Sequence, residues 1–569
     1  MKALGHFLRR QLLIVGLVLA VLGCAAAGLV QSSGGVRVSD IRFTGKDGTR
    51  MSALLYVPAS ARAATPAPAI LAVHGYFNSR ETQDAFAIEF ARRGFVVLAM
   101  DQTGHGYSGG RAFQNGFGGP DGLRYLRSLP FVDKTRIGLE GHSMGGWTVD
   151  RAAEALPDGY RALVLVGSSV GKPFAPEGTA TYPRNLALIE GRFDEFAPTM
   201  WGATSGFTVG SAPKLMALFG TSQPVRPGEI YGSIATGTAR VYYAPPVSHA
   251  GAHFSPAAVA LAADWFDRTL GTDRPVAGQI WYWKEAATLV ALIGFVLFVA
   301  GAFETCLRLP AFASLRAQPG ASGDLARMPR WSITLPILLT ALLYLPLIML
   351  GAMIPNFGPF TQSFTTATAF WGIVQSALLF GIARWRAKRP LLDRSQAPLV
   401  LGLAVATLLI AYALVATTAW LFTVDYRFWI LGLKPLDAQR FGLFLAYLPF
   451  YVLLFLLLLS PLQASLVATG SALRQYGQVV LALCGGFIVF LAAEYVPLFL
   501  RGTLLTPAAG LYTILAIQFV PILGACAMLT VFTYRRTARL LPAALLCALL
   551  VTWYITAGQA IQGVGLPGG

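Results

Sequence analysis

The chain has 569 residues, of which 55% are hydrophobic and only 12% are charged, so it is too apolar for a wholly water-soluble protein and long enough for more than one domain. Its formal net charge of +17 does not indicate a nucleic-acid partner, because the basic residues cluster between apolar segments and are not interleaved with aromatic residues along one face. We therefore expect a membrane-associated protein that binds no nucleic acid.

The cysteines and histidines divide the chain into two parts. None of the five cysteines lies between residues 25 and 305, which excludes a disulfide framework there. All six histidines precede residue 254, so imidazole chemistry belongs to the first half. No His-x-x-Glu-His or similar ligand spacing occurs, and we expect neither a metal nor a cofactor.

An apolar segment at residues 12–30 follows Lys2, Arg9 and Arg10 and is about long enough to cross a bilayer. A cleaved signal peptide, a lipoprotein processing site ending at Cys24 and a twin-arginine signal are alternative interpretations. We interpret residues 1–35 as an uncleaved signal anchor.

Residues 36–275 alternate between strand and helix patterns, as is typical of an α/β domain with a mostly parallel sheet. A hairpin is expected at residues 38–56, turning at 45–48. Ser79 is expected to cap the first helix. Further strands are predicted at residues 69–73, 95–100, 137–140, 162–166, 186–190 and 239–243, and helices at 81–93, 122–129 and 255–270.

The second half, residues 282–560, is predicted to be an all-α membrane domain with about eight spans. The apolar stretches are residues 286–303, 331–354, 363–382, 397–422, 441–460, 478–500, 509–532 and 540–558.

The distribution of basic residues predicts the orientation of these spans. With the N-terminus inside, the inner segments carry Lys2, Arg9, Arg10, Arg308, Arg316, Arg327, Arg330, Arg384, Arg386, Lys388, Arg389, Arg394, Arg474, Arg535, Arg536 and Arg539. The short outer loops carry only Arg427, Lys434, Arg440 and Arg501. We therefore expect a bacterial inner-membrane protein with a cytoplasmic N-terminus and with the α/β domain and the C-terminus in the periplasm or outside.

Ser143 lies where a strand pattern ends in Gly-His-Ser-Met-Gly and a helix-forming run begins. This is the strand–turn–helix context of a nucleophile elbow, in which the serine hydroxyl is exposed at a tight turn. The pattern G-x-S-x-G also occurs around Ser108 and Ser169, but more glycine follows the first and Lys-Pro follows the second. Ser143 is therefore the predicted nucleophile.

Several motifs resemble those of the α/β-hydrolase superfamily, particularly its dienelactone-hydrolase and prolyl-oligopeptidase-like branches. They are Ala-Val-His-Gly-Tyr at residues 72–76, Asp-Gln-Thr-Gly-His-Gly-Tyr-Ser at 101–108, the serine motif at 136–146, Gly-Arg-Phe-Asp at 191–194 and Ser-His at 248–249. The resemblance covers about residues 38–270 and implies a Ser, acid, His order of catalytic residues along the chain.

By this resemblance Asp194 is the acid and His249 the base. Glu195 is the alternative acid and His253 the alternative base. The backbone N–H groups of Tyr76 and Met144 would form the oxyanion hole. The resemblance makes Asp101 structural, fixing the loop beside the site, and we interpret three more histidines as turn residues hydrogen-bonded to backbone: His74, His105 and His142.

Two further features remain open at the level of sequence. Residues 196–238, between acid and base, are either substrate-selecting loops or plain surface loops, and the site is either open or covered by the membrane surface. Glu494 lies within an apolar span, where a carboxyl group is costly. It is either functional or a packing residue partnered by Gln375 or Gln518.

Together these patterns predict a membrane-embedded serine hydrolase that cleaves a small-molecule or lipid ester through an acyl-enzyme, with the lipid bilayer as its surroundings. They identify no protein partner. A peptidase or amidase of prolyl-oligopeptidase type is one alternative. A transporter or lipid-handling membrane module with an attached hydrolase domain is the other.

Overall fold

The computed structural model describes residues 2–77, 79–272, 276–317, 331–386, 396–462, 466 and 471–564, without the side chains of residues 2–10 and 386. Some basic residues used in the orientation prediction fall outside this description: Arg327, Arg330, Lys388, Arg389 and Arg394, and the side chains of Lys2, Arg9, Arg10 and Arg386.

One sheet organises the first half of the chain, with strand order β1-β2-β4-β3-β5-β6-β7-β9-β8. Its strands are β1 (Arg37–Thr44), β2 (Arg50–Val57), β3 (Ala67–Val73), β4 (Val96–Asp101), β5 (Val132–His142), β6 (Ala162–Val166), β7 (Leu186–Ile189), β8 (Ile230–Tyr231) and β9 (Arg240–Tyr243). The strands from β4 to β9 in this order run parallel, while β1, β2 and β8 pair antiparallel. The predicted α/β fold is confirmed, and we call residues 37–270 the sheet domain.

Helices cover both faces of this sheet, each through its own apolar cluster. One face carries α3 (Gly119–Ser128), α4 (Met144–Ala155), α5 (Ala197–Trp201) and α6 (Pro213–Phe219). The other carries α2 (Asp84–Arg92) and α8 (Pro256–Leu270). Short helical turns occur at η1 (Arg80–Gln83), η2 (Asn115–Gly118), η3 (Gly206–Ser211) and α7 (His249–Ala252). The central strands are thus buried between two helical layers, as parallel strands require.

The expected cap at Ser79 is wrong. Its hydroxyl donates a hydrogen bond of 2.6 Å to Glu81 and makes no capping bond to the η1 backbone. A capping oxygen must accept a backbone N–H, but Ser79 Oγ accepts the guanidinium of Arg427 at 3.0 Å instead, a charge-assisted bond from the other domain.

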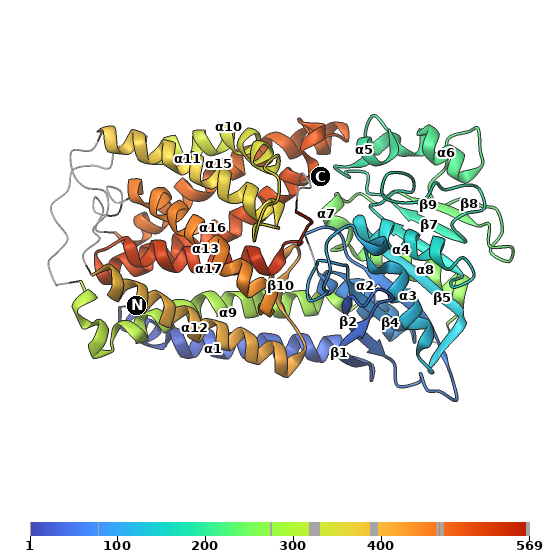
Figure 1. Cartoon of the computed structure of the whole chain (residues 1–569), viewed down its shortest axis with the longest axis horizontal. Coiled ribbons are helices and arrows are strands. Elements are labelled where there is room, and N and C mark those ends of the chain that lie inside the picture. The colour runs from blue at the N-terminus through green and yellow to red at the C-terminus, as the bar shows by residue number, and fades with distance from the viewer. Residues whose placement is uncertain are drawn as a thin grey trace.

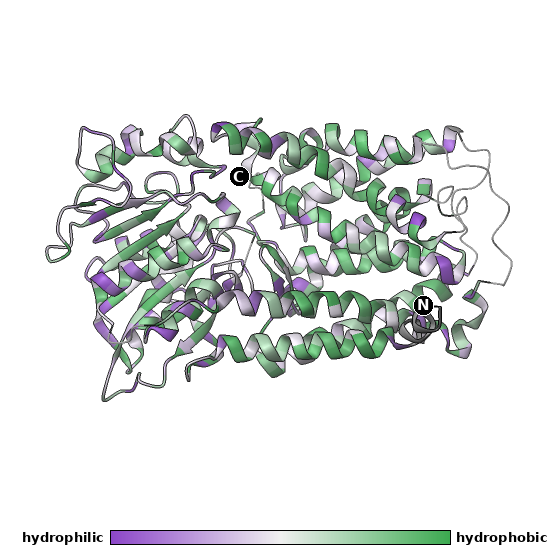
Figure 2. Ribbon diagram, turned by 180° about the vertical axis from the view of Figure 1, so that it is seen from behind, coloured by the Kyte–Doolittle hydropathy of each residue, from purple (hydrophilic) through white to green (hydrophobic). Residues whose placement is uncertain are grey.

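Long helices form the rest of the molecule, which we call the helical domain. They are α1 (Lys2–Gln31), α9 (Trp281–Leu307), α10 (Trp331–Ala352), α11 (Ser363–Arg386), α12 (Ala397–Phe422), α13 (Ala438–Leu459), α15 (Ala472–Arg501), α16 (Gly510–Thr537) and α17 (Leu541–Gly558). The connecting segments contain η4 (Pro310–Leu315), the hairpin β10 (Tyr426–Phe428) and β11 (Leu431–Leu433), η5 (Ser460–Leu462) and η6 (Pro507–Ala509). Within the described part of the chain, nine helices are long and apolar enough to cross a membrane, and Figure 2 shows hydrophobic residues along these helices.

Helix α1 packs along α9 through small residues. A Cβ atom on Gly16 would lie 2.3 Å from the backbone nitrogen of Phe298, and one on Gly294 would lie 2.5 Å from that of Ala20. Such close backbone approach is how helices associate where lipid removes the hydrophobic driving force. The first apolar segment is therefore an integral part of the helical domain.

The sheet domain lies at one end of the bundle formed by the long helices (Figure 1). The hairpin β10–β11 and the C-terminal end of the chain lie at that same end, and the N-terminus lies at the opposite end (Figure 1). The loops that follow the carboxyl ends of β3, β4, β7 and β9 contact the helical domain. Since ligands bind at the carboxyl edge of parallel sheets, the site-bearing edge faces the helices.

Candidate active site

Ser143 occupies a strained turn between β5 and α4. Its backbone has φ 55° and ψ −123°, a conformation that costs free energy for a residue with a side chain. Two hydrogen bonds hold the turn. The backbone N–H of Ser143 donates to the Val166 carbonyl at 2.9 Å, and Ser168 Oγ donates to the Ser143 carbonyl at 2.7 Å. These bonds fix the half-buried Ser143 side chain at the carboxyl edge of the sheet.

Glycine is required on both sides of this turn. A Cβ atom on Gly141 would lie 2.2 Å from the carbonyl oxygen of Gly145, and one on Gly145 would lie 2.1 Å from that of Val73. Strand β5, helix α4 and the end of β3 therefore approach more closely than any side chain would allow. This is the packing that a nucleophile elbow needs.

Asp194 and His249 form a buried pair next to this turn. His249 Nδ1 lies 2.9 Å from Asp194 Oδ2 and 3.1 Å from Oδ1, and the exposed fractions are 5% for His249 and 0% for Asp194. Burial alone would disfavour the charged imidazole, but the Asp194 carboxylate outweighs it and raises the pKa of His249. Because the carboxylate accepts the Nδ1 proton, the Nε2 atom is left free to act as a base.

The pair is packed against the elbow through Gly167, the residue after β6. Its φ is +51°, and a Cβ atom there would lie 3.1 Å from both Asp194 Oδ2 and His249 Nδ1. Among the described residues neither Ser143 Oγ nor His249 Nε2 forms a hydrogen bond. Catalytic hydrogen bonds are commonly long until substrate is bound.

The alternative acid, Glu195, is engaged elsewhere. One oxygen accepts the backbone N–H of His249 at 2.7 Å, and the other accepts the hydroxyl of Tyr495, from α15, at 2.6 Å. Burial, followed by the negative charge of Asp194, raises the pKa of Glu195 to about 7. Glu195 therefore holds the His249 backbone, whereas Asp194 contacts the ring.

The alternative base, His253, has no carboxylate partner. Both of its ring nitrogens are buried without a hydrogen bond within the described part of the structure. Burial and then the neighbouring His249 lower the pKa of His253 to about 3. It stays neutral, and its ring lies 4.8 Å from the ring of His142.

The other histidines bond to backbone. His142 Nε2 lies 3.0 Å from the carbonyl oxygen of His249, which helps to fix the backbone of the candidate base. His74 Nδ1 lies 2.7 Å from the carbonyl oxygen of Gly75, and His105 Nδ1 lies 3.0 Å from that of Thr103. Burial lowers the pKa of His74 to about 4 and that of His105 to about 3, so both are neutral turn residues.

The two candidate oxyanion donors flank Ser143. Met144 is the first residue of α4, and Tyr76 follows Gly75, where a Cβ atom would lie 3.1 Å from the Ser143 Cβ. The Tyr76 hydroxyl accepts a hydrogen bond from the side chain of Gln562, in the C-terminal segment. The loop that carries this donor is therefore held by the far end of the chain, a contact that no local sequence signal indicates.

Asp101 anchors the loops beside the site. It accepts hydrogen bonds from the backbone N–H groups of Arg80 at 2.8 Å and Tyr107 at 2.9 Å, and from Ser52 Oγ at 2.9 Å. Ser108, one of the alternative serines, donates to the Asp101 carbonyl at 2.7 Å and is buried. Both residues have structural contacts here.

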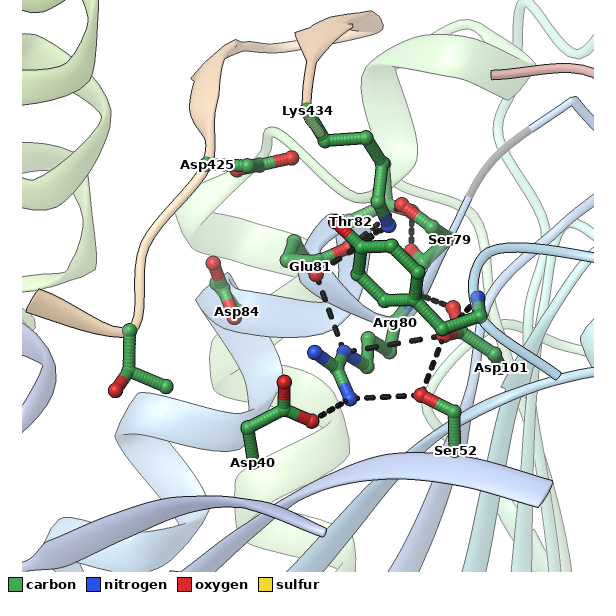
Figure 3. Close-up of polar contacts among 12 residues, drawn as sticks. Asp40, Ser52, Ser79, Arg80, Glu81, Thr82, Asp84, Asp101, Asp425 and Lys434 are labelled. Carbon is green, nitrogen blue, oxygen red and sulfur yellow. Dashed lines mark hydrogen bonds and ion pairs between the residues drawn. The ribbon is translucent and has the colours of Figure 1, made fainter. Parts of the chain in front are cut away.

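A buried ionic cluster joins these loops to the helical domain (Figure 3). Lys434, just after β11, lies 3.1 Å from Glu81, and Arg80 Nε also lies 3.1 Å from Glu81. Arg427, from β10, donates to Ser79 Oγ at 3.0 Å and pairs with Asp425 at 2.8 Å. Burial opposes ionisation of Glu81, but the charges of Lys434, Arg80 and Arg427 outweigh it and hold its pKa well below the usual range.

The helical domain covers the carboxyl edge of the sheet directly. Trp429 Nε1 donates to the Ala250 carbonyl at 2.5 Å, next to His249. The C-terminal segment exchanges backbone hydrogen bonds with the loop after β4, from Ile561 N to the Gly104 carbonyl at 2.9 Å and from Ala112 N to the Ile561 carbonyl at 2.7 Å. We expected either an open site or one covered by the membrane surface, and these contacts fit neither alternative. The cover is made of the protein's own helices and hairpin.

The segment between acid and base also meets the helices. Residues 196–238 form α5, η3, α6 and β8, and the N–H of Gly206 donates to the Gly502 carbonyl at 2.9 Å. Phe207, in η3, lies against the same glycine, because a Cβ atom on Gly502 would lie 3.0 Å from the Phe207 ring. This segment contributes to the domain interface, so the plain surface loop is wrong for its first part.

Glu494 lies near the sheet-domain end of α15 and is 2% exposed. Its Oε2 accepts the backbone N–H of Thr506 at 3.0 Å. The expected partners bond elsewhere, Gln375 to Thr340 at 2.7 Å and Gln518 to Tyr554 at 2.7 Å. The partner prediction is wrong because Glu494 faces the α15–η6 loop, which it ties back to the helix.

Comparisons with known proteins agree with this geometry. Residues 64–212 match the family model described as serine aminopeptidase, S33. A monoacylglycerol lipase of Mycolicibacterium smegmatis is 26% identical over 209 residues, which cover 35% of this chain and 69% of the lipase. An uncharacterised protein of Escherichia coli, YcjY, is 32% identical over 112 residues, and the chain spans only 37% of its length.

Among solved structures, an esterase of Pyrococcus furiosus aligns with a TM-score of 0.30 at 18% identity, over 42% of this chain and 94% of the esterase. The chain thus combines an α/β-hydrolase domain with a domain of helices that are long and apolar enough to cross a membrane.

Proposed function

We propose that this protein is a membrane-bound serine hydrolase that uses Ser143, His249 and Asp194 to cleave an ester. The observation that carries the proposal is the buried Asp194–His249 pair, with Nδ1 2.9 Å from Oδ2, packed through Gly167 against the strained turn of Ser143. A carboxylate hydrogen-bonded to an imidazole, next to a serine at a strained turn, is the arrangement that makes a hydroxyl nucleophilic.

In the acylation step, Ser143 Oγ attacks the ester carbonyl carbon while His249 Nε2 takes the hydroxyl proton. The Asp194 carboxylate stabilises the imidazolium that forms. The N–H groups of Met144 and Tyr76 donate to the oxyanion of the tetrahedral intermediate. When the carbon–oxygen bond of the ester breaks, the leaving alcohol takes the proton from His249, and the acyl group remains on Ser143.

In the deacylation step, water attacks the acyl carbon and His249 takes a proton from it. The bond between Ser143 Oγ and the acyl carbon then breaks, the serine recovers its proton from His249, and the carboxylic acid leaves. The second step uses the same donors as the first, so one constellation serves both halves of the reaction.

An ester is favoured over an amide because the lipase relative acts on an acylglycerol by its name and because the domain is attached to long apolar helices. The description of the matching family as a serine aminopeptidase supports the second candidate, a peptidase. Hydrolysis of aminoacyl p-nitroanilides without hydrolysis of p-nitrophenyl acyl esters would favour the peptidase.

The proposed orientation has the N-terminus in the cytoplasm and the sheet domain outside the bacterial inner membrane. Support comes from Arg308, Arg535 and Arg536, which lie at the ends of α9 and α16 that are remote from the sheet domain. Of the basic residues expected outside, Arg427, Lys434 and Arg440 are buried in the domain interface, so they are not free surface charges.

A fluorophosphonate probe tests the mechanism and the orientation together. We expect labelling of the intact protein and none of Ser143→Ala, while Ser169→Ala, a change in an equivalent G-x-S-x-G pattern, keeps its labelling. Labelling of intact spheroplasts by a membrane-impermeant probe would support the orientation. Equal labelling of the native protein and Ser143→Ala would refute the proposed nucleophile.

A further inference from the structure

An apolar groove runs between α9, α16 and α17 and ends under the hairpin β10–β11. Its walls include Leu292 and Phe295 from α9, Ala525 and Leu529 from α16, and Val551 from α17. About 960 Å³ of empty space lies between and beside these walls, part of it open to the surroundings. The groove lies within the membrane-spanning helices, where the available occupant is a hydrocarbon chain.

The groove adjoins a second, polar cavity at its sheet-domain end. Gly432 and Tyr554 line both. The polar cavity is also lined by Arg427, Lys434 and Phe77. Phe77 is the residue after Tyr76, the proposed oxyanion donor, so the polar cavity reaches the loop that borders Ser143.

Gly432 lies at this junction. A Cβ atom at this position would lie 2.5 Å from the guanidinium of Arg427, so a larger residue would displace the arginine from its place across the hairpin. The cations of the polar cavity are paired with Glu81 and Asp425, so the cavity carries no excess positive charge. It therefore suits a neutral polar group such as an ester with its alcohol, and an anionic head group would find no free cation here.

The contacts at the carboxyl edge of the sheet agree with a path for the substrate from the groove, through the polar cavity, to Ser143. Trp429, Tyr495 and the C-terminal segment close the site towards the helices, and the Phe364 ring lies 4.3 Å from that of Phe77. A substrate that approaches between the two domains from the bilayer meets the groove first and the catalytic loop second.

We infer that the groove between α9, α16 and α17 binds the acyl chain of a membrane lipid ester and presents its ester end to Ser143 through the polar cavity beside Phe77. The inference rests on the proposed hydrolase function and adds to it the substrate class, a long-chain neutral acyl ester drawn from the bilayer.

Filling the groove should change chain-length preference without changing the chemistry. Ala525→Phe places a ring in the groove from a half-exposed position, and Leu292→Trp does so from the opposite wall. Ala286→Phe, at an exposed position on α9 away from the groove, is the matched control. The readout is the ratio of kcat/KM for p-nitrophenyl palmitate to that for p-nitrophenyl butyrate, with the full chain in phosphatidylcholine vesicles.

We expect each filling variant to lower this ratio by about tenfold, the effect of displacing about two methylene groups. Butyrate hydrolysis and fluorophosphonate labelling should stay near native, and the control should behave as native. If Ala525→Phe loses its labelling, Leu292→Trp decides the result, because its ring enters from a different helix.

An unchanged ratio in the labelled filling variants would overturn the inference, as would equal losses on both esters. A native protein that shows no preference for palmitate over butyrate would overturn it as well. Failure of the proposed function looks different, because neither ester would be cleaved and Ser143 would not be labelled.

Discussion

Tyr495, from the long apolar helix α15, donates its hydroxyl to the carboxylate of Glu195 at 2.6 Å, and Glu195 follows the proposed catalytic acid Asp194 in sequence. The other oxygen of Glu195 accepts the backbone N–H of His249 at 2.7 Å. One carboxylate therefore connects a helix of the helical domain to the backbone of the candidate base. The two domains meet at the candidate site.

Replacing Tyr495 with Phe should make activity more sensitive to acid. The Tyr495 hydroxyl stabilises ionised Glu195, so its loss raises further a pKa that is already about 7, and Glu195 becomes protonated at higher pH. We expect kcat/KM near pH 6.5 to fall about threefold to tenfold, with recovery above pH 8. A pH–rate profile tests this, with Tyr282→Phe, at an exposed position on α9, as the control. A uniform loss at every pH would contradict it.

Asp194→Asn should lower kcat by about 10³–10⁴-fold, because the carboxylate sets the tautomer and stabilises the imidazolium. The substitution should also shift the pH dependence of kcat/KM in a defined direction. Asp194 raises the pKa of His249 against the effect of burial, so removing its charge lowers that pKa. The acid limb of kcat/KM should therefore move to lower pH. Glu195→Gln, the alternative acid, should cost far less in kcat, and the reverse ranking would refute Asp194 as the acid.

The two candidate bases can be separated directly. His249→Gln should abolish esterase activity, whereas His253→Gln should stay within about tenfold of native, because His253 has no carboxylate partner and remains neutral. Steady-state hydrolysis of p-nitrophenyl butyrate by the two variants tests this. Their thermal stability shows whether each variant is folded. Retention of activity in His249→Gln would assign the base to His253.

Lys434→Met should destabilise the domain interface. Lys434 is 2% exposed and pairs with Glu81, so its loss leaves a buried carboxylate with one fewer positive charge beside it, at a cost of about 3 kcal/mol. The midpoint of thermal unfolding in detergent should fall, and a second change, Glu81→Gln, should restore part of the loss. Two effects that simply add would show that the pair is not coupled.

Much of this protein could be predicted from local patterns. The apolar spans, the strand–turn–helix context of Ser143 and the alternation of strands with helices follow from periodicity, glycine placement and span length, which act over short stretches of chain. The structure brings Asp194 and His249 together at the turn of Ser143 because the carboxyl ends of parallel strands meet at one edge of a sheet. The sequence thereby determined the elements and the residues of the candidate site.

What covers that site was decided only by tertiary structure. Gln562 reaches Tyr76, Trp429 reaches Ala250 and Lys434 reaches Glu81 across long sequence separations, and none of these partners follows from a local preference. The Glu494 carboxylate likewise accepts a hydrogen bond from the backbone N–H of Thr506 and none from the expected glutamines. Such pairs form because the docked domains remove water from polar groups, which must then find partners wherever the packing brings them. The enclosure of the catalytic edge and the groove beneath it are therefore properties of the assembled fold.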